Sequence, residues 1–394
     1  MPNIYSNYSF TQNGVAYPFD NVFVPADAFR RGNLWVWGGN STGQLGTNDI
    51  TTKSTPVTTF FGTSTWKQVA CRGSGRSAAI KIDGTLWNWG AGAAGALGHN
   101  SEVSSITPIT TFAGGSNWKQ VVTGDEFTAA VKLDGTLWVW GQNLTGSLGI
   151  NDATTINKLT PVTTFLGGNN WDQVAAANSF VAAIKTDGTL WTWGSNAYGQ
   201  LGINDTTDRL TPVTTFLGGT NWRQVTTRDR TISATKTDGT LWLWGRGLYG
   251  RLGTNDTTDR LTPVTTFLGG TNWTQVESGY TTVAIKNDGT LWTWGRNNNA
   301  QLGVNDGVDR STPVTTFTGG TNWKNVFRGG SSVGGIKTDG TLWVWGQNNN
   351  AQLGTNDTIT KSTPVTTFLG GNKWKQAYSA VDFTLAVEYV DYLI

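Results

Sequence analysis

The chain has 394 residues and a net charge of +2, and its 28 basic residues are scattered among 26 acidic ones. Because nucleic-acid binding normally requires clustered Lys and Arg on a more basic domain, this charge distribution argues against a DNA or RNA partner. No apolar run approaches the ~18 residues of a membrane-spanning helix, so membrane insertion is not expected. The single cysteine, Cys71, excludes an intrachain disulfide.

Residues 1–30 are uncharged up to Asp20 and rich in Tyr, Phe and Asn. They lack a basic region followed by an apolar run, so no signal peptide is predicted. A disordered tail is usually poorer in aromatic residues. We therefore predict that residues 1–30 form an arm that docks on another subunit, with packing along the chain's own fold as the alternative. The candidate contact residues of this arm are Tyr5, Tyr8, Phe10, Phe19, Val22 and Phe23.

Residues 31–394 form an array of near-identical repeats. The motif Leu-Trp-x-Trp-Gly occurs seven times between Leu34 and Leu342, at spacings of 50 to 53 residues. Trp-x-Gln/Asn-Val and Thr-Pro-Val/Ile-Thr-Thr-Phe recur with the same period, and the two tryptophan motifs account for all 21 tryptophans. A fixed period of about 51 residues indicates one supersecondary unit per repeat, stacked against its neighbours.

Each repeat contains the signals of about four short strands. Residues 182–185 and 190–194 flank Asp187-Gly188, and Asp-Gly between two strand-like runs is a strong hairpin signal. Residues 211–216 predict an outer strand, where proline is tolerated, and the next strand begins at Trp222. Four strands per repeat make one propeller blade, so the seven repeats predict an all-β, seven-bladed β-propeller.

The two ends of the array predict how the ring closes. The first Leu-Trp-x-Trp-Gly copy has no preceding hairpin partner, since residues 31–33 stand where Asp-Gly-Thr stands elsewhere. The chain ends with residues 383–388, which match the missing partner strand. We therefore expect the C-terminal strand to pair with residues 34–38, so that one blade contains both ends and no sheet edge is left exposed.

The extended motif Leu-Trp-x-Trp-Gly-x-Asn-x-x-Gly-Gln-Leu-Gly, seen around residues 38–46 and 193–202, resembles the regulator of chromosome condensation repeat family over about residues 32–390. The resemblance implies a seven-bladed propeller, nucleotide exchange on a small GTPase, and nucleosome binding. The repeat spacings leave no room for the wedge hairpin that exchange uses in that family. The high identity between repeats, with residues 19–24, is also similar to repeat proteins of tailed bacteriophages of marine cyanobacteria, which implies a place on the virion surface.

No residue pattern predicts catalysis, a cofactor or a metal. His99 is the only histidine, and Cys71 is placed at a hairpin tip with an ordinary thiol. The recurring Asp of Asp-Gly-Thr is explained by its turn. Asp205 and Asp208 are followed at once by Arg209, which favours an ion pair or turn cap over a calcium site. The tryptophans are predicted to pack in the core, with sugar stacking by an exposed subset as the alternative.

The variable residues lie in two sets of loops, one after each Trp-x-Trp-Gly and one before each inner hairpin. Drift on an unconstrained surface is one explanation, and binding loops on a rigid scaffold are the other. Arg and Tyr are the residue types that dominate binding hot spots. The candidate binding residues are Tyr198, Arg228, Asp229, Arg230, Tyr249, Tyr280 and Arg328.

The leading hypothesis is a non-enzymatic structural or adhesive propeller on the surface of a virus particle. Its arm would bind other virion subunits, and its loops would meet a host glycan or protein. The alternative is a soluble, cytoplasmic module that binds sugars or proteins. A nucleotide exchange factor for a small GTPase ranks third.

Overall fold

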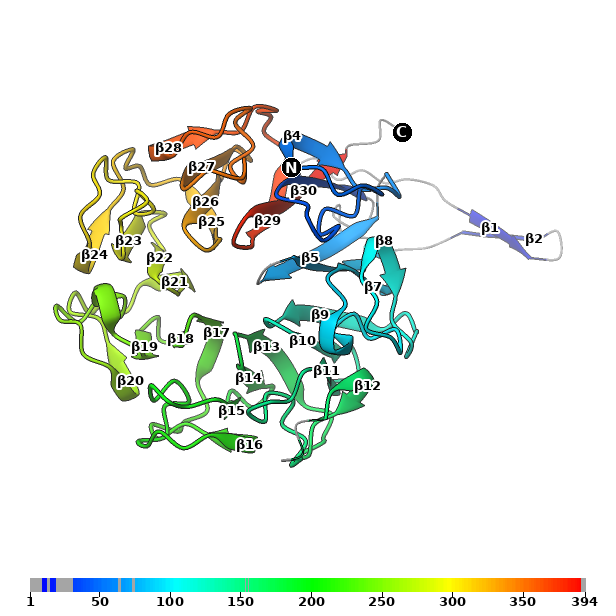
Figure 1. Cartoon of the computed structure of the whole chain (residues 1–394), viewed down its shortest axis with the longest axis horizontal. Coiled ribbons are helices and arrows are strands. Elements are labelled where there is room, and N and C mark those ends of the chain that lie inside the picture. Colours follow the sequence, from blue (N-terminus) through cyan, green and yellow to red (C-terminus); the bar gives the residue numbers. More distant parts are fainter. Residues whose placement is uncertain are drawn as a thin grey trace.

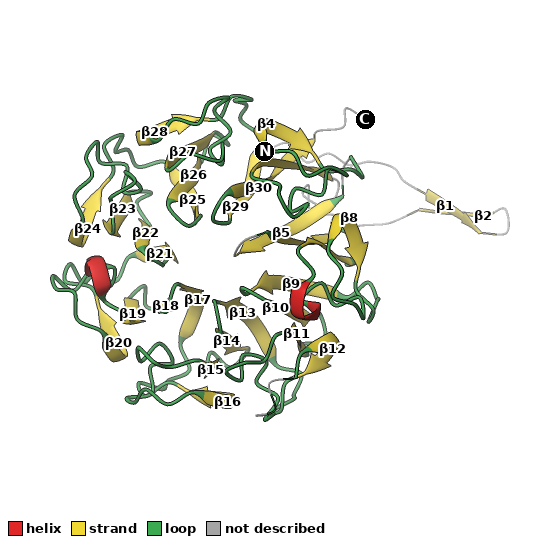
Figure 2. Ribbon diagram, in the orientation of Figure 1, coloured by secondary structure: helices red, strands yellow, loops and turns green. Residues whose placement is uncertain are grey.

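The structure is a computed structural model and describes residues 9–12, 15–18, 31–62, 65–72, 75–152, 154 and 156–390. Seven four-stranded antiparallel sheets form a ring around a central axis (Figure 1), and we call the space enclosed by their inner strands the channel. The predicted all-β, seven-bladed propeller is thus confirmed. Strands alternate with long loops around the ring, and the described residues include the short 3-10 helices η2 (Ala93–Gly95) and η3 (Leu248–Gly250) (Figure 2).

The blades are numbered in chain order, and each is given from its innermost to its outermost strand. Blades 1 to 3 contain β5 (Trp66–Arg72), β6 (Arg76–Lys81), β7 (Leu86–Gly90) and β8 (Ser105–Thr110); β9 (Trp118–Thr123), β10 (Phe127–Lys132), β11 (Leu137–Gly141) and β12 (Lys158–Thr163); β13 (Trp171–Ala176), β14 (Phe180–Lys185), β15 (Leu190–Gly194) and β16 (Arg209–Thr214). Blades 4 to 6 contain β17 (Trp222–Arg228), β18 (Thr231–Lys236), β19 (Leu241–Gly245) and β20 (Arg260–Thr265); β21 (Trp273–Glu277), β22 (Thr281–Lys286), β23 (Leu291–Gly295) and β24 (Arg310–Thr315); β25 (Trp323–Arg328), β26 (Ser332–Lys337), β27 (Leu342–Gly346) and β28 (Lys361–Thr366). Blade 7 contains β29 (Trp374–Ser379), β30 (Phe383–Val390), β3 (Arg31–Gly38) and β4 (Lys53–Thr58).

Blade 7 closes the ring as the sequence predicts. β30 pairs with β3 in continuous antiparallel register from Arg31 opposite Val390 to Gly38 opposite Phe383. The last strand of the array therefore fills the gap left by the first repeat, and every inner strand has a neighbour. β30 is longer than the predicted 383–388 by two residues.

Each ring face carries a different set of connections. The turn face holds the Asp-Gly turns between the second and third strands, in which the Asp carboxylate accepts hydrogen bonds from the Thr two residues later. These aspartates are Asp83, Asp134, Asp187, Asp238, Asp288 and Asp339. The loop face holds the tips between the first and second strands and the loops after Trp-x-Trp-Gly. The loop face comprises residues 39–42, 91–94, 142–145, 195–198, 246–249, 296–299 and 347–350, with tips 75–76, 124–127, 178–180, 228–230, 279–281, 329–332 and 380–382.

The tryptophans form the contacts between blades. In each Leu-Trp-x-Trp-Gly motif the second Trp is fully buried, and its indole N–H donates to a loop carbonyl of the preceding blade at 2.8 to 3.0 Å. Within blade 4, Trp222 packs on both Trp242 and Trp244, with its ring centroid 6.3 and 6.1 Å from theirs. The first Trp is half-buried, and in blades 1 to 6 a Lys ammonium lies 4.1 to 5.0 Å from its ring. Core packing by tryptophan is thereby confirmed.

Two predictions for single segments have different outcomes. Cys71 lies within β5 and is buried, because that strand continues to Arg72, so its predicted place at a hairpin tip is wrong.

Of the arm residues, Phe10 lies in β1 (Ser9–Gln12), opposite Tyr17 of β2 (Val15–Pro18). The other predicted arm contacts, Tyr5, Tyr8, Phe19, Val22 and Phe23, lie outside the described residues. The docking role of the arm stays a prediction.

The indole hydrogen bond between blades makes a direct prediction. Trp244→Phe keeps an aromatic ring in the core but leaves the carbonyl of Gln200 without its donor and opens a small cavity. We expect the free energy of unfolding to fall by ~2–4 kcal/mol, measured by urea denaturation. Trp242→Phe is the matched control, since Trp242 is half-buried and donates only to the Thr240 hydroxyl, and it should cost ~1 kcal/mol or less. Equal losses in both variants would contradict the bond's role.

Candidate binding surface

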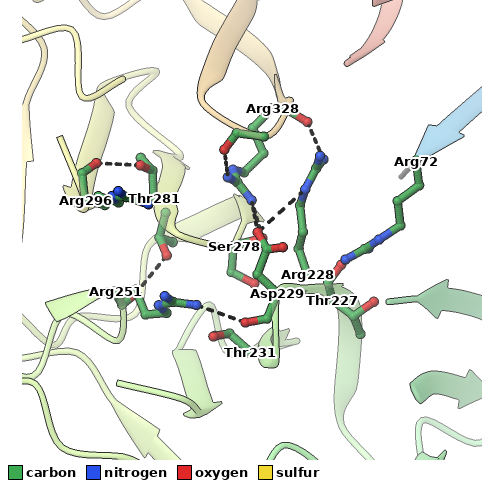
Figure 3. Close-up of polar contacts among 12 residues, drawn as sticks. Arg72, Thr227, Arg228, Asp229, Thr231, Arg251, Ser278, Thr281, Arg296 and Arg328 are labelled. Atoms are coloured by element: carbon green, nitrogen blue, oxygen red, sulfur yellow. Dashed lines mark hydrogen bonds and ion pairs between the residues drawn. The ribbon is translucent and has the colours of Figure 1, made fainter. Parts of the chain in front are cut away.

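Three arginines from different blades meet at the loop-face end of the channel (Figure 3). Nη1 of Arg72 donates to the carbonyl oxygens of Ala176 and Thr227, at 2.5 and 2.7 Å. Nη1 of Arg228 donates to the carbonyl oxygens of Arg328 and Ser379, at 2.8 and 3.2 Å. These side chains span the channel mouth and join inner strands that are not neighbours in the ring.

The third arginine, Arg328, donates to the carbonyl oxygens of Ser278 and Gly330, at 3.2 and 3.0 Å. Asp229 supplies the countercharge, with Oδ2 lying 3.6 Å from Nη1 of Arg328 and 3.9 Å from Nε of Arg228. Burial would raise the pKa of Asp229, but the surrounding guanidinium groups of Arg228 and Arg328 hold that pKa below its usual value. Asp229 therefore stays ionised as part of the arginine cluster.

Glu277 shares the channel end but behaves differently. Burial raises the pKa of its carboxyl to about 7, and the attraction of Arg328, Arg228 and Arg72 offsets only part of that rise. No ion pair with Glu277 is found among the described residues. The carboxyl is therefore half-protonated near neutral pH.

A cavity of about 480 Å³ opens beside this cluster. Its walls combine guanidinium, carboxylate and amide groups from blades 1 to 4, with one apolar residue from blade 7. The lining residues are Arg72, Asp125, Glu126, Gln142, Asn178, Ser179, Arg228, Asp229 and Val381. A polar concave site thus occupies the centre of the loop face.

Tyrosines and arginines stack on the loop face of blades 3 and 4. The Tyr198 ring contacts two guanidinium groups, with the Cζ of Arg230 at 4.9 Å and that of Arg246 at 4.8 Å from its centroid. Tyr198 follows β15, Arg230 is at the tip before β18, and Arg246 follows β19. Loops from two neighbouring blades therefore build one stack.

A second stack joins blades 4 and 5. The rings of Tyr249 and Tyr280 meet edge to face, with centroids 6.4 Å apart. Arg296 lies over Tyr249 at 4.8 Å, and Arg251 lies against Tyr280 at 4.7 Å. Arg251 is fully buried and donates from Nη1 to the carbonyl oxygen of Asp229, so this stack connects to the channel cluster.

The same region contains strained backbone. Asp229, Arg230 and Tyr249 have φ values of 47°, 70° and 68°, in the left-handed region that favours glycine. In the rest of the described chain, the non-glycine residues with positive φ are Asn or Ala. Such conformations cost of order 1–3 kcal/mol each and persist where function or surrounding structure requires them.

The predicted binding residues divide into two groups. Tyr198, Arg230, Tyr249 and Tyr280 lie together at the surface of the loop face. Arg228 and Arg328 are buried and hydrogen-bonded to main-chain carbonyls, so they close the channel mouth instead of forming exposed loop contacts. Asp229 belongs with this second group.

Four arginines of the surface were not singled out from the sequence: Arg72, Arg246, Arg251 and Arg296. Aligning the repeats with one another would have identified three of them. Arg246 and Arg296 stand where the other repeats have an uncharged residue (Gly39, Ala91, Gln142, Ser195 and Gln347), and Arg251 stands where most have Gln.

The Asn-Asp-x-x-Asp loops at the outer rim form the ion pairs that the sequence predicts. Asp205 Oδ2 lies 2.6 Å from Nη2 of Arg209, and Asp208 accepts a hydrogen bond from the main-chain N–H of Asn196. The described part of the chain contains no group of three or more His, Cys, Asp or Glu side chains placed to hold a metal. Nor does it contain a helix long and apolar enough to cross a bilayer.

The family model of the RCC1-like domain matches residues 33–386. The chain belongs to the RCC1-like domain family. This RCC1-like chain is 34% identical over 233 residues to the ultraviolet-B receptor UVR8 of Arabidopsis thaliana. The aligned region covers 58% of the chain and 52% of UVR8. The chain is 29% identical over 229 residues to the human E3 ubiquitin-protein ligase HERC2, covering 56% of the chain and 5% of HERC2. The chain thus matches about half or less of these relatives.

Solved structures of low identity share the fold. Human WBSCR16 superposes with a TM-score of 0.77 at 19% identity, over 91% of this chain and 98% of that chain. Prp20p of Saccharomyces cerevisiae superposes with a TM-score of 0.78 at 17% identity, over 91% of this chain and 92% of that chain. These likenesses extend over the whole RCC1-like propeller.

Glu277 predicts a pH dependence of stability. Its pKa of about 7 in the folded chain lies above the ~4.3 of an exposed glutamate, so the folded state holds the proton more tightly. The resulting stabilisation is complete below about pH 4 and is lost as the pH rises through 7. Relative to Glu277→Gln, which cannot titrate there, the wild type should lose stability between about pH 5 and about pH 8. Urea unfolding of both proteins measures this difference, and a pH-independent difference would contradict it.

Proposed function

We propose that this RCC1-like propeller is a non-enzymatic protein-binding module that contacts its partner through the loop face. The observation that carries the proposal is the convergence of Tyr198, Arg230, Tyr249 and Tyr280 on one face of a closed, rigid ring. Tyr buries a large area at little entropic cost, and Tyr and Arg both dominate binding hot spots. The cavity at the channel mouth gives the same face a concave centre.

The family supports a binding role. The solved structure of Prp20p is described together with that protein's binding to Gsp1p and histones, and another structure shows it bound to Kap60. Nucleotide exchange on a small GTPase is a second candidate on family grounds, and release of labelled GDP from such a GTPase tests it. A sugar-binding role has less support, because Lys ammonium groups lie against the half-buried tryptophans.

Covering each face of the ring with a bulky uncharged polymer tests the proposal. Val381→Cys on the loop face and Thr186→Cys on the turn face are both exposed sites, and either can be conjugated to a maleimide polyethylene glycol. Cys71 should not react, because it is buried and burial raises the pKa of its thiol. We expect a protein captured by the immobilised wild type from an extract of the source cells to be lost with the Val381→Cys conjugate and kept with the Thr186→Cys conjugate. The opposite pattern, or capture unaffected by either block, would overturn the proposal.

The virion role remains a further prediction, made from the first ~40 residues and the repeat identity. Mass spectrometry of purified extracellular particles tests it, with a capsid protein as the reference for stoichiometry. Stoichiometric presence in the particles is the expected result, with the loop face then meeting a host or virion protein. Recovery only from the soluble extract would exclude the virion surface and place the module in the cytoplasm.

A further inference from the structure

We propose that the loop face of blades 3 to 5 binds an acidic segment of the partner protein; this inference rests on the proposed function and names the chemistry of its ligand. The Arg–Tyr surface that would bind it consists of Tyr198, Arg230, Arg246, Tyr249, Tyr280 and Arg296.

The guanidinium groups of this surface lack anionic partners. Across the described residues, the side chains of Arg230, Arg246 and Arg296 form no ion pair and donate no hydrogen bond, and their contacts are with tyrosine rings. The rim arginines are the opposite case, since Arg209 and Arg260 each lie 2.6 Å from an aspartate oxygen. The loop face thus presents three positive charges whose hydrogen-bonding edges are open to a ligand.

Two of these arginines stand at a loop position that varies around the ring. The residue after Trp-x-Trp-Gly is Arg246 in blade 4 and Arg296 in blade 5, whereas the other blades have Gly39, Ala91, Gln142, Ser195 and Gln347. Tyr198 and Tyr249 occupy one equivalent loop position in blades 3 and 4. Arg and Tyr at these two positions are thus confined to one sector of the ring.

Stacking prepares the guanidinium groups for carboxylates. A guanidinium group held against an aromatic ring by a cation–π contact still has N–H donors in its planar fork that match the two oxygens of a carboxylate. Holding the side chain in place before binding lowers the entropy that association costs. The left-handed backbone of Arg230 and Tyr249 is a separate sign that the fold maintains this arrangement at a cost.

A short acidic segment fits better than a nucleic acid. The three open guanidinium groups lie on one side of the loop face, and Asp125 and Glu126 line the cavity in its centre. A long polyanion crossing the face would meet these carboxylates and be repelled. A few Asp or Glu side chains of a peptide can instead pair with the arginines of blades 4 and 5 alone.

The test uses the full chain and fluorescence anisotropy with labelled hexaglutamate, hexaglutamine and oligo(dT) as probes. Wild type should bind hexaglutamate, with an affinity that falls as salt is added, and should bind hexaglutamine at least ~10-fold more weakly. The double variant Arg246→Gln/Arg296→Gln should weaken hexaglutamate binding at least ~10-fold, the loss of two charge-assisted contacts. Its fold should persist, because Gln already stands at the equivalent position in blades 2 and 6.

Arg209→Gln/Arg260→Gln is the matched control, since it removes the same charge from the rim and should change the affinity less than ~2-fold. Equal weakening in both variants would overturn the site, as would no binding of hexaglutamate. Tighter binding of oligo(dT) would point to nucleic acid instead, and a dimer that only the loop-face variant dissociates would point to a second copy. If hexaglutamate fails to bind but the Val381→Cys conjugate still loses the captured protein, the acidic ligand is rejected and the protein-binding function stands.

Discussion

Every blade is tied to the one before it by a buried indole N–H that donates to a loop carbonyl, and the rest of the ring depends on this bond. Blade 5 is tied to blade 4 through the carbonyl oxygen of Arg251, which accepts from the Trp294 indole at 2.9 Å and from the Thr282 hydroxyl at 2.8 Å. The accepting residue lies in the loop after Trp-x-Trp-Gly. The contact that holds blades together therefore also fixes the backbone of the loops that vary.

This coupling explains how side chains change on the loop face without loss of the fold. The bond uses only the main chain of the loop, so Arg251 can replace the Gln200 of the preceding repeat while its carbonyl keeps the same role. The new guanidinium then reaches the carbonyl oxygen of Asp229 in the neighbouring tip. A conserved backbone frame thus carries a different set of charges in each blade.

The fold could be predicted from the sequence because its determinants are local and repeated. Asp187-Gly188 specifies its own hairpin. The first repeat lacks the strand that precedes this Asp-Gly turn in the other repeats, and that gap in the 51-residue period implies that β30 closes the ring. The channel cluster is only partly specified in this way, since Arg72 meets Ala176 and Thr227 at separations of 104 and 155 residues, about two and three repeats, but the period does not say which blade carries an arginine that reaches across the ring. Arg228 and Arg328 are the last residues of the inner strands β17 and β25, and their burial follows from how closely seven inner strands converge.

The buried charges at the channel mouth and the open charges beside it have one physical origin. Inner strands converge there, so Arg228 and Arg328 lose water and must be satisfied by carbonyl oxygens and by Asp229. A short distance outward, Arg246 and Arg296 are half-buried and form no ion pair within the described part of the chain. Tyrosine rings hold them in place without neutralising them. Such a surface binds an anion with less loss of entropy, because its side chains were already ordered during folding.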